Sequence, residues 1–145
     1  MSKTDYVVGF VFSSDRSKVV LVKKNRPEWQ AGLYNGVGGK MEEEDQGNSF
    51  HTMTREFREE TGVEVSYLDW ELYAVLSGCN FLIKVFCLFS DEVVAKVTTV
   101  TDEPIEIVDV DLNVLRTTAI SNAAWLIGAA LDGDRNRFAL EVTYA

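Results

Sequence analysis

One predicted helix limits the fold of this chain more than any other feature of its sequence. Helical periodicity covers Ser49–Thr61, with Asn48 or Ser49 as the expected N-cap and Gly62 as the expected stop. Three apolar residues recur at the spacing of a single helix face, namely Phe50, Met53 and Phe57. Because such a face must be buried, the rest of the chain has to supply a surface for this helix to cover.

Three glutamates lie beside this apolar face. Glu56, Glu59 and Glu60 project within an arc of about 100°, because residues three and four apart share one side of a helix. The opposite side carries His51, Arg55 and Arg58. Like charges at this spacing destabilise a helix, and partial burial increases their repulsion, so a divalent cation is a natural compensation. A solvated acidic face of an ordinary amphipathic helix is the alternative interpretation.

Glycines are concentrated upstream of this helix. Residues 35–39 read Asn-Gly-Val-Gly-Gly and are followed by Lys-Met-Glu. Glycine lets the backbone approach a metal ion or a phosphate closely, which a side chain would prevent. The segment therefore predicts a flexible binding loop, and a plain turn is the alternative.

The remaining patterns predict an α/β fold. Residues 81–89 are almost continuously apolar, which indicates a strand buried on both faces. No repeat or linker divides the chain, so we expect a single domain over residues 1–145, with a mixed sheet between helices. Strands are expected at 6–12, 19–22, 70–76, 81–89, 105–110 and 138–144, the first two forming a hairpin, and a second helix at 121–131.

Charge and composition exclude several classes of partner. The 23 acidic residues against 14 basic ones give a net charge of −9, whose field repels polyanions, so general coating of nucleic acid is not expected. No apolar run reaches the length of a membrane span, and the N-terminus lacks an export signal. We therefore expect a cytoplasmic protein without a membrane partner.

The cysteine and histidine content restricts the possible metal sites. Cys79 and Cys87 fit neither a zinc ribbon nor a disulfide framework, so they are expected to be free, buried thiols. His51 is the single histidine, which excludes multi-histidine sites. Any metal must then be bound by oxygen atoms, and oxygen ligands favour Mg²⁺ or Mn²⁺.

Taken together, the glycines and the acidic helix resemble the Nudix box. That motif runs Gly, five spacers, Glu, seven spacers, then Arg-Glu-apolar-x-Glu-Glu-x-Gly-apolar, and its last nine positions match residues 55–63. Its glycine corresponds to Gly39. Residues 29–39 are similar to the strand that leads into the box, and 101–105 with 125–127 are similar to the later half of the family. The resemblance implies an α/β/α sandwich around a mixed sheet.

The chain departs from the motif at one place. Fifteen residues, 40–54, separate Gly39 from Arg55, where the pattern has thirteen. The position of the first motif glutamate is Asp45 when counted forward from the glycine, and Gly47 when counted back from the arginine. The acidic run at 42–45 is either a solvated loop or the source of a substitute for that glutamate.

The resemblance implies roles for the residues that match the box. Glu56, Glu59 and Glu60 would bind the metal together with the backbone carbonyl of Gly38. Arg55 would orient a carboxylate through a charge-assisted hydrogen bond. Glu56 is our hypothesis for the general base, which makes Glu56, Arg55 and Glu59 the candidate catalytic residues.

The resemblance also implies a further metal ligand from a loop beyond the box. Glu103, within Thr-Asp-Glu-Pro, is our candidate and Glu106 is second, and an exposed loop acid is the alternative. Four basic residues are candidates for contacts with phosphate, or are solvated surface cations: Lys40, Arg26, Lys23 and Lys24.

A few residues are candidates for recognition of the substrate base. Asn35 matches an asparagine that reads the base in the branch acting on oxidised purine nucleoside triphosphates, and a turn-forming Asn-Gly pair is the alternative. Two consecutive acids that complete base recognition in that branch appear here as Ser121 and Asn122. Three aromatic residues are available either for base stacking or for core packing, Trp29, Tyr34 and Trp125.

The function implied by the resemblance is hydrolysis of a nucleoside diphosphate linked to another group. We expect a Mg²⁺- or Mn²⁺-dependent pyrophosphohydrolase that converts a (deoxy)nucleoside triphosphate to the monophosphate and pyrophosphate. ADP-ribose or a dinucleoside polyphosphate is the alternative substrate. A nucleotide-sensing module without catalysis is the alternative of another class, motivated by the two extra residues in the box. Members of the family are often dimers, so a homodimer is an expectation of the same kind.

Overall fold

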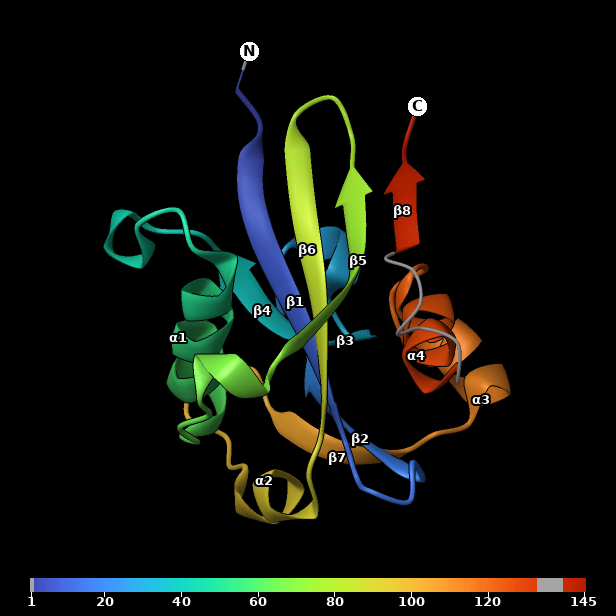
Figure 1. The fold of residues 1–145 in the computed structure, drawn as a ribbon. Coiled ribbons are helices and arrows are strands. Elements are labelled where there is room, and N and C mark those ends of the chain that lie inside the picture. The colour runs from blue at the N-terminus through green and yellow to red at the C-terminus, as the bar shows by residue number, and fades with distance from the viewer. Residues whose placement is uncertain (1, 133–139) are drawn as a thin grey trace.

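The computed structural model describes residues 2–132 and 140–145 (Figure 1). Within these residues the strands are β1 Thr4–Phe12, β2 Lys18–Lys23, β3 Tyr34–Asn35, β4 Val37–Lys40, β5 Glu71–Ser77, β6 Phe81–Phe89, β7 Ile105–Asp109 and β8 Leu140–Thr143. The α-helices are α1 Ser49–Thr61, α2 Asp91–Lys96, α3 Leu112–Thr118 and α4 Ala123–Leu131, and short 3-10 helices occupy Glu28–Gln30, Glu43–Asp45 and Tyr67–Asp69.

The described strands form one mixed sheet. Their order is β3-β2-β1-β6-β5-β8, with β4 paired to β1 and β7 paired to β2. β1 runs parallel to β6, and β5 runs parallel to β8, whereas the other pairs are antiparallel. Helix α1 covers one side of the sheet, and α3 and α4 cover the other (Figure 1). The predicted α/β/α sandwich around a mixed sheet is confirmed.

Strand β1 divides the interior into two cores by its alternating side chains. Val8, Phe10 and Phe12 pack with α4 on one side of the sheet. Val7 and Val11 pack with α1 on the other side. Each fully buried apolar side chain of this size contributes about 1.5–3 kcal/mol, so β1 stabilises the cores on both sides of the sheet.

Strand β6 shows why its sequence is so apolar. Val85, Phe86 and Cys87 are buried in succession, so both faces of this stretch are covered, while the rest of the strand is half-buried. In the neighbouring strand β5 the register shifts between Leu72 and Ala74. This irregularity lets Tyr73 and Ala74 both enter the core on the α4 side.

Helix α1 begins and ends where the sequence predicts. The Asn48 side chain accepts hydrogen bonds from the backbone N–H groups of Phe50 and His51, at 3.0 and 3.4 Å. At the other end Gly62 adopts the left-handed conformation with φ of 77°, and its N–H donates to the Arg58 carbonyl. Both ends are therefore fixed by local signals.

Some expectations from the sequence are wrong. The glycine segment is not a flexible loop, because Val37–Lys40 is strand β4 in the sheet. Helices α2 and α3 were not predicted, and α4 begins at Ala123 and not at residue 121. Cys79 is exposed, whereas Cys87 is buried, and both thiols are free as predicted.

Two further expectations concern the ends of elements and the membrane. The predicted closing strand at 138–144 is seen as Leu140–Thr143, and residues 138–139, like the predicted stop at Gly133, lie outside the described residues. None of the helices in the described parts of the chain has both the length and the apolar character needed to cross a membrane.

Candidate active site

Strand β4 brings a stretch of bare backbone against helix α1. It pairs with β1 so that Gly38 is opposite Val8 and Gly39 is opposite Val7. A Cβ atom at Gly38 would lie 2.1 Å from the Val7 carbonyl oxygen. A Cβ atom at Gly39 would lie 2.3 Å from the carboxylate carbon of Glu56. The absence of side chains is therefore what allows the acidic helix to approach the sheet this closely.

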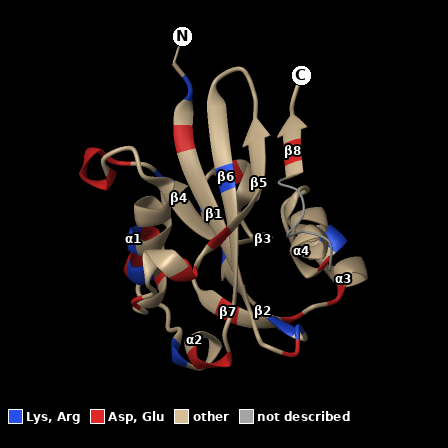
Figure 2. Ribbon diagram, in the orientation of Figure 1, with Lys and Arg blue, Asp and Glu red and all other residues tan. Residues whose placement is uncertain are grey.

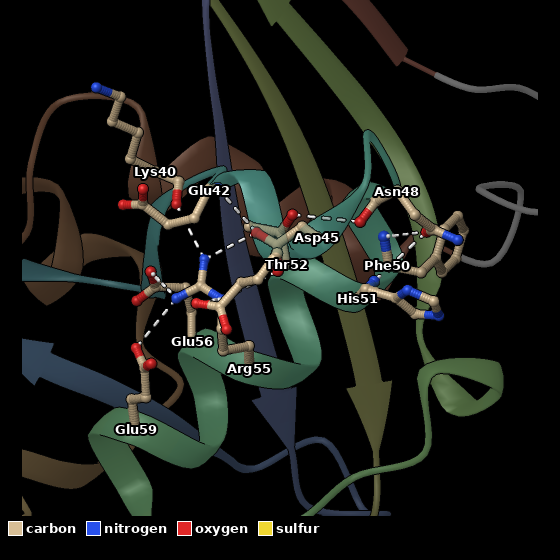
Figure 3. A network of polar contacts seen from close by, with 11 residues as sticks. Lys40, Glu42, Asp45, Asn48, Phe50, His51, Thr52, Arg55, Glu56 and Glu59 are labelled. Carbon is tan, nitrogen blue, oxygen red and sulfur yellow. Dashed lines mark hydrogen bonds and ion pairs between the residues drawn. The ribbon is translucent and has the colours of Figure 1, made fainter.

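Arg55 is the centre of the polar network on α1 (Figure 3). Its Nε and Nη2 atoms donate to the two carboxylate oxygens of Asp45, at 3.0 and 2.8 Å. Its Nη1 atom donates to both Glu56 and Glu59, at 3.0 and 3.1 Å. Nη2 also donates to the carbonyl oxygen of Lys40, at 3.1 Å. One buried guanidinium thus connects the glycine strand, the following loop and two glutamates of the helix.

Asp45 stands where the first glutamate of the box would stand in the forward count. It is buried, its carboxylate pairs with Arg55 through two hydrogen bonds, and one oxygen also accepts from the Glu42 N–H at 2.9 Å. The hydrogen bonds from Arg55 outweigh the effect of burial and lower the pKa of Asp45 to about 2. Within the acidic run at 42–45, Asp45 makes the short, buried contact with Arg55, whereas the exposed Glu44 lies 3.6 Å from it.

The extra length of the box follows Asp45. The chain turns through Gln46 and Gly47, both in the left-handed region with φ of 52° and 75°, and then reaches the N-cap Asn48. All three residues are exposed. The insertion therefore widens a surface turn and leaves the contact between Asp45 and Arg55 in place.

Glu56 and Glu59 share the same donor but differ in environment. The Glu56 side chain is largely buried against Gly39, and burial is the main cause of a raised pKa, which hydrogen bonding and charge from Arg55 oppose. The Glu59 side chain is 50% exposed. Glu56 is therefore the carboxylate of this pair that faces a low-dielectric environment.

Glu60 is the most strongly perturbed carboxylate of the three. Its Oε2 atom is buried and has no hydrogen-bond partner in the part of the chain that the structure describes. Burial, followed by repulsion from Glu56, raises the pKa of Glu60 to about 7. The positive charge of Lys24 and a backbone hydrogen bond from Gly38 act in the opposite direction. A buried oxygen without a partner is costly, and a cation would satisfy it.

These residues fit a divalent cation, although no preformed cluster is present. Among residues 2–132 and 140–145, no three His, Cys, Asp or Glu side chains already converge as metal ligands. The oxygen donors that could close on an ion are nevertheless adjacent on α1, and the unpartnered Glu60 oxygen is one of them. Carboxylates and backbone carbonyls are the donors that Mg²⁺ and Mn²⁺ prefer.

Glu103, predicted as a further metal ligand, is buried beside Lys24 at the end of β2. Its Oε1 atom accepts from Lys24 Nζ at 2.9 Å, and its Oε2 atom accepts from the backbone N–H groups of Asn25 and Arg26, at 2.7 and 3.2 Å. Burial raises the pKa of Glu103, but these hydrogen bonds outweigh it and hold the pKa below its ordinary value. The second candidate, Glu106, accepts a hydrogen bond from the Tyr34 hydroxyl at 2.8 Å.

Two of the four predicted phosphate contacts, Arg26 and Lys40, lie on the surface. The Arg26 side chain is 63% exposed and pairs with Asp102. Lys40 is exposed, and its side chain extends away from α1 (Figure 3). Neither side chain lines the cavity described next.

A cavity of about 790 Å³ opens beside the glycine strand. Gly38 and Gly39 form part of its wall, so the cavity and the acidic helix meet across β4. Asn35 lines it, with its Oδ1 accepting from the Gly36 N–H at 2.7 Å and its Nδ2 near Gln30. Other lining residues are Lys24, Trp29, Asn80, Phe81, Ser121 and Asn122.

The predicted stacking residues are separated by the fold. Trp29 lines the cavity and is 67% exposed. Tyr34 packs under the ammonium group of Lys23, which lies 4.9 Å from the ring centre, and does not line the cavity. Trp125 lies on the exposed side of α4. Of these three aromatic residues, only Trp29 is therefore placed for contact with a molecule in the cavity.

The box motif, the carboxylate network and the sandwich fold agree with a comparison of the sequence with known families. A model of the NUDIX domain family matches residues 3–125. The chain belongs to the Nudix family. The comparison with curated proteins gives no match.

Solved structures of Nudix proteins share the fold. A MutT structure, from Aliivibrio salmonicida or Vibrio cholerae, is 21% identical, with a TM-score of 0.69 over 89% of this chain and 99% of that one. MutT from Bacillus halodurans is 22% identical, with a TM-score of 0.71 over 98% and 90%. The NUDIX domain of Shewanella oneidensis NrtR, solved with ADP-ribose, is 21% identical, with a TM-score of 0.66 over 94% and 89%.

Proposed function

We propose that this Nudix protein is a divalent-metal-dependent hydrolase that converts a nucleoside triphosphate to the monophosphate and pyrophosphate. The observation that carries the proposal is the buried Glu60 oxygen that has no hydrogen-bond partner among the described residues. The same side chain is repelled by Glu56 and accepts a backbone hydrogen bond from Gly38, which lines a nucleotide-sized cavity. Two partly buried carboxylates are stabilised by a divalent cation, and the same cation would neutralise the charge of a bound polyphosphate.

The metal ligands in this proposal are Glu56, Glu59, Glu60 and the Gly38 carbonyl. Divalent ions at such a site neutralise the charge of a diphosphate and lower the pKa of bound water. Glu103 is kept out of this set, because Lys24 and two backbone N–H groups already satisfy its oxygens.

The chain itself supplies proton transfer and orientation. Glu56 is the proposed proton acceptor for the attacking water, because burial gives its carboxylate a raised pKa and because the carboxylate packs against Gly39, which lines the cavity. Arg55 holds Glu56 and Glu59 from one nitrogen, which fixes the direction of both carboxylates. The attack breaks one P–O bond, and pyrophosphate leaves with the electron pair.

The group linked to the nucleoside diphosphate distinguishes the two candidate substrates, a phosphate in a nucleoside triphosphate and a ribose in ADP-ribose. The solved structures that resemble this chain include MutT proteins and an ADP-ribose-bound NUDIX domain at nearly the same identity. ADP-ribose therefore remains the alternative substrate. The two extra residues, which motivated a purely sensing function, leave the Arg55 network complete and give no support to that alternative.

A substrate panel tests the proposal. For nucleoside triphosphates and oxidised purine triphosphates, phosphate is measured after treatment with inorganic pyrophosphatase. For ADP-ribose and dinucleoside polyphosphates, whose hydrolysis gives phosphomonoesters and no pyrophosphate, it is measured after treatment with alkaline phosphatase. Each substrate is assayed with MgCl₂ and with EDTA. We expect magnesium-dependent release of pyrophosphate from at least one triphosphate. Hydrolysis of ADP-ribose alone would replace the proposed substrate, and hydrolysis of none would overturn the proposed activity.

A matched pair of variants tests the site. Glu60→Gln is expected to abolish turnover and to weaken Mn²⁺ binding measured by electron paramagnetic resonance, while the circular dichroism spectrum stays unchanged. Glu64→Gln, an exposed glutamate outside the network, is the control and is expected to behave like the wild type. Full magnesium-dependent activity in Glu60→Gln would contradict the assignment.

A further inference from the structure

The cavity beside β4 is almost free of charge. Among its lining residues that the structure describes, Lys24 is the only one with a charged side chain. The others are apolar, aromatic, hydroxyl or amide residues. A polyphosphate that enters this cavity in a protein with a net charge of −9 therefore meets one local cation there.

Lys24 is held in place on both its main chain and its side chain. Its N–H donates to the Leu33 carbonyl at 2.9 Å, and its carbonyl accepts from the Gly32 N–H at 2.8 Å. Its ammonium group donates to Glu103 at 2.9 Å, and this pair is largely covered, with side chains 17% and 6% exposed. A flexible lysine is thereby ordered before any ligand binds, which lowers the entropy cost of using it.

Glu103 fixes the position of the Lys24 ammonium group between the cavity and the acidic cluster. Glu103 is anchored by backbone N–H groups of the loop after Lys24, so the carboxylate is itself fixed. Lys24 and Gly38 both line the cavity, and the Gly38 N–H donates to Glu60, whose carboxylate is also within reach of the Lys24 charge. The lysine therefore lies where the uncharged cavity meets the acidic cluster, which is where a phosphate chain has to pass.

We propose that Lys24 binds the phosphate chain of the nucleotide and that Glu103 is the positioning residue for this lysine, not a metal ligand. The inference rests on the proposed function for the identity of the ligand class, a nucleoside di- or triphosphate. An ammonium group donates three hydrogen bonds, so it can keep Glu103 and also donate to a phosphate oxygen. The exposed cations Arg26 and Lys40 have no such role.

Equilibrium binding tests the lysine. The probes are the α,β-methylene analogues of the nucleoside triphosphates, which cannot be cleaved between the first two phosphates, and the corresponding nucleosides, all titrated by calorimetry in MgCl₂. Lys24→Met is expected to weaken binding of the tightest analogue by about 10- to 100-fold, the range for a hydrogen bond to a charged group, and to leave the nucleoside affinity unchanged. Lys24→Arg should recover part of the loss.

A second lysine, at the start of β2, provides the matched control for Lys24, which follows the end of this strand. Lys18 also pairs with a carboxylate, that of Asp109, but it lies at the opposite end of β2 and its side chain is 48% exposed. Lys18→Met removes the same charge from the protein without touching the cavity. It is expected to bind the analogue like the wild type, so a general effect of net charge would be visible as an equal loss in both variants, which would overturn the proposal.

Glu103 is tested by a double-mutant cycle and by metal binding. If Glu103 acts through Lys24, Glu103→Gln weakens analogue binding in the wild type and has no further effect in Lys24→Met. If Glu103 is a metal ligand, Glu103→Gln lowers Mn²⁺ affinity as Glu60→Gln does. We expect Mn²⁺ affinity to stay within about twofold of the wild type, with unfolding curves confirming that both variants are folded.

The two proposals can fail separately. Equal analogue binding by Lys24→Met and the wild type would overturn the role of Lys24, even if the wild type hydrolyses triphosphates. Loss of Mn²⁺ affinity in Glu103→Gln would overturn the role of Glu103. Binding of an analogue without hydrolysis of any substrate would overturn the proposed function and leave the Lys24 test valid, and no binding of any analogue would overturn both.

Discussion

The two sides of the sheet are built from opposite chemistry. On one side, α1 carries a buried arginine and its carboxylates, and a charged network reaches from the helix to β4. On the other side, α4 reads Ala-Ala-Trp-Leu-Ile-Gly-Ala-Ala-Leu and packs on the sheet through apolar contacts and a hydrogen bond from the Tyr73 hydroxyl to the Leu126 carbonyl. The exposed Arg16 side chain donates to the Leu131 carbonyl at the end of this helix. Figure 2 shows charged residues along α1 and a largely uncharged α4.

This difference separates the tasks of the protein. The α1 side has the groups that can hold cations and move a proton, and the cavity extends along the α4 side, where neutral amides and aromatic rings can contact a base. The cavity and the acidic helix approach each other at Gly38 and Gly39 of β4, which have no side chains. We therefore expect the stability of the α1 side to depend on its charged network, and the stability of the α4 side to depend on apolar packing.

The largest effect on stability is expected from Arg55. Arg55→Met leaves the buried Asp45 carboxylate without its partner, and removing one member of a buried ion pair costs about 3–5 kcal/mol. Urea denaturation at pH 7 measures the free energy of unfolding. Arg58→Met, on the exposed side of the same helix, is the control and should stay within about 0.5 kcal/mol of the wild type. Equal losses in the two variants would contradict a buried charged network.

A pH-dependent effect is expected from Glu60 in metal-free protein. Its pKa in the folded state, about 7, lies above the ordinary value of 4.5, so the folded state binds a proton more tightly than the unfolded state does. This contribution to stability is present at low pH and is lost as the pH rises from about 4.5 to about 7. The wild type should therefore lose about 3 kcal/mol relative to Glu60→Gln over this range.

The measurement is urea denaturation in EDTA at a series of pH values, with both proteins in parallel. Glu64→Gln provides the comparison with an exposed carboxylate, and its difference from the wild type should not change across the same pH range. A constant difference between the wild type and Glu60→Gln would mean that this carboxylate is solvated.

Two glycine substitutions distinguish the sides by the sign of their effect. Gly39→Ala places a Cβ atom 2.3 Å from the Glu56 carboxylate carbon, so Glu56 has to leave Arg55, and we expect a loss of about 1–3 kcal/mol. Gly128→Ala lies within α4, where the new Cβ atom would be 3.5 Å from Leu112 Cδ1, an ordinary contact. Alanine is the better helix former, so we expect a gain of about 0.5–1 kcal/mol. Thermal denaturation measures both, and two effects of the same sign would remove this contrast.

The smallest effect is expected from a neutral hydrogen bond on the α4 side, between the Tyr73 hydroxyl and the Leu126 carbonyl. Tyr73→Phe removes the 2.8 Å bond to the Leu126 carbonyl without changing the packing of the ring, which costs about 1 kcal/mol. Because both partners are uncharged, the loss should be the same at pH 5 and pH 8. A loss that varies with pH would show that charged groups act on this side of the sheet as well.

Helix α1 illustrates what the sequence predicts well. Its cap, its apolar spacing and its glycine stop are all local, and the structure has the same bounds as the prediction. Helices α2 and α3 span six and seven residues, too short to show a periodic pattern, and neither was predicted. The glycines at 38–39 were interpreted as a flexible loop that could approach a metal ion or a phosphate, although residues 29–39 were also found similar to a strand. In β4, Gly38 instead approaches the backbone of β1, and Gly39 approaches Glu56.

Arg55 and Lys24 illustrate what the sequence leaves open. On a helical wheel Arg55 lies on the side opposite the apolar stripe, which favours exposure, yet the loop that contains Asp45 folds over it. The counting rule did identify Asp45 as one of two positions for the missing glutamate. The pair of Lys24 and Glu103 joins residues 79 positions apart, and it depends on the pairing of β2 with β7, which no local pattern specifies.

The turn at 46–48 has a consequence for the evolution and the engineering of this protein. Asp45 is fixed by Arg55 on one side of the turn, and α1 is fixed by its own cap on the other, so the length between them is set by neither contact. Gly47 has open space around it. Longer connections between two anchored points cost little free energy. This turn is therefore a natural place for a grafted peptide or a fluorescent label beside the acidic cluster.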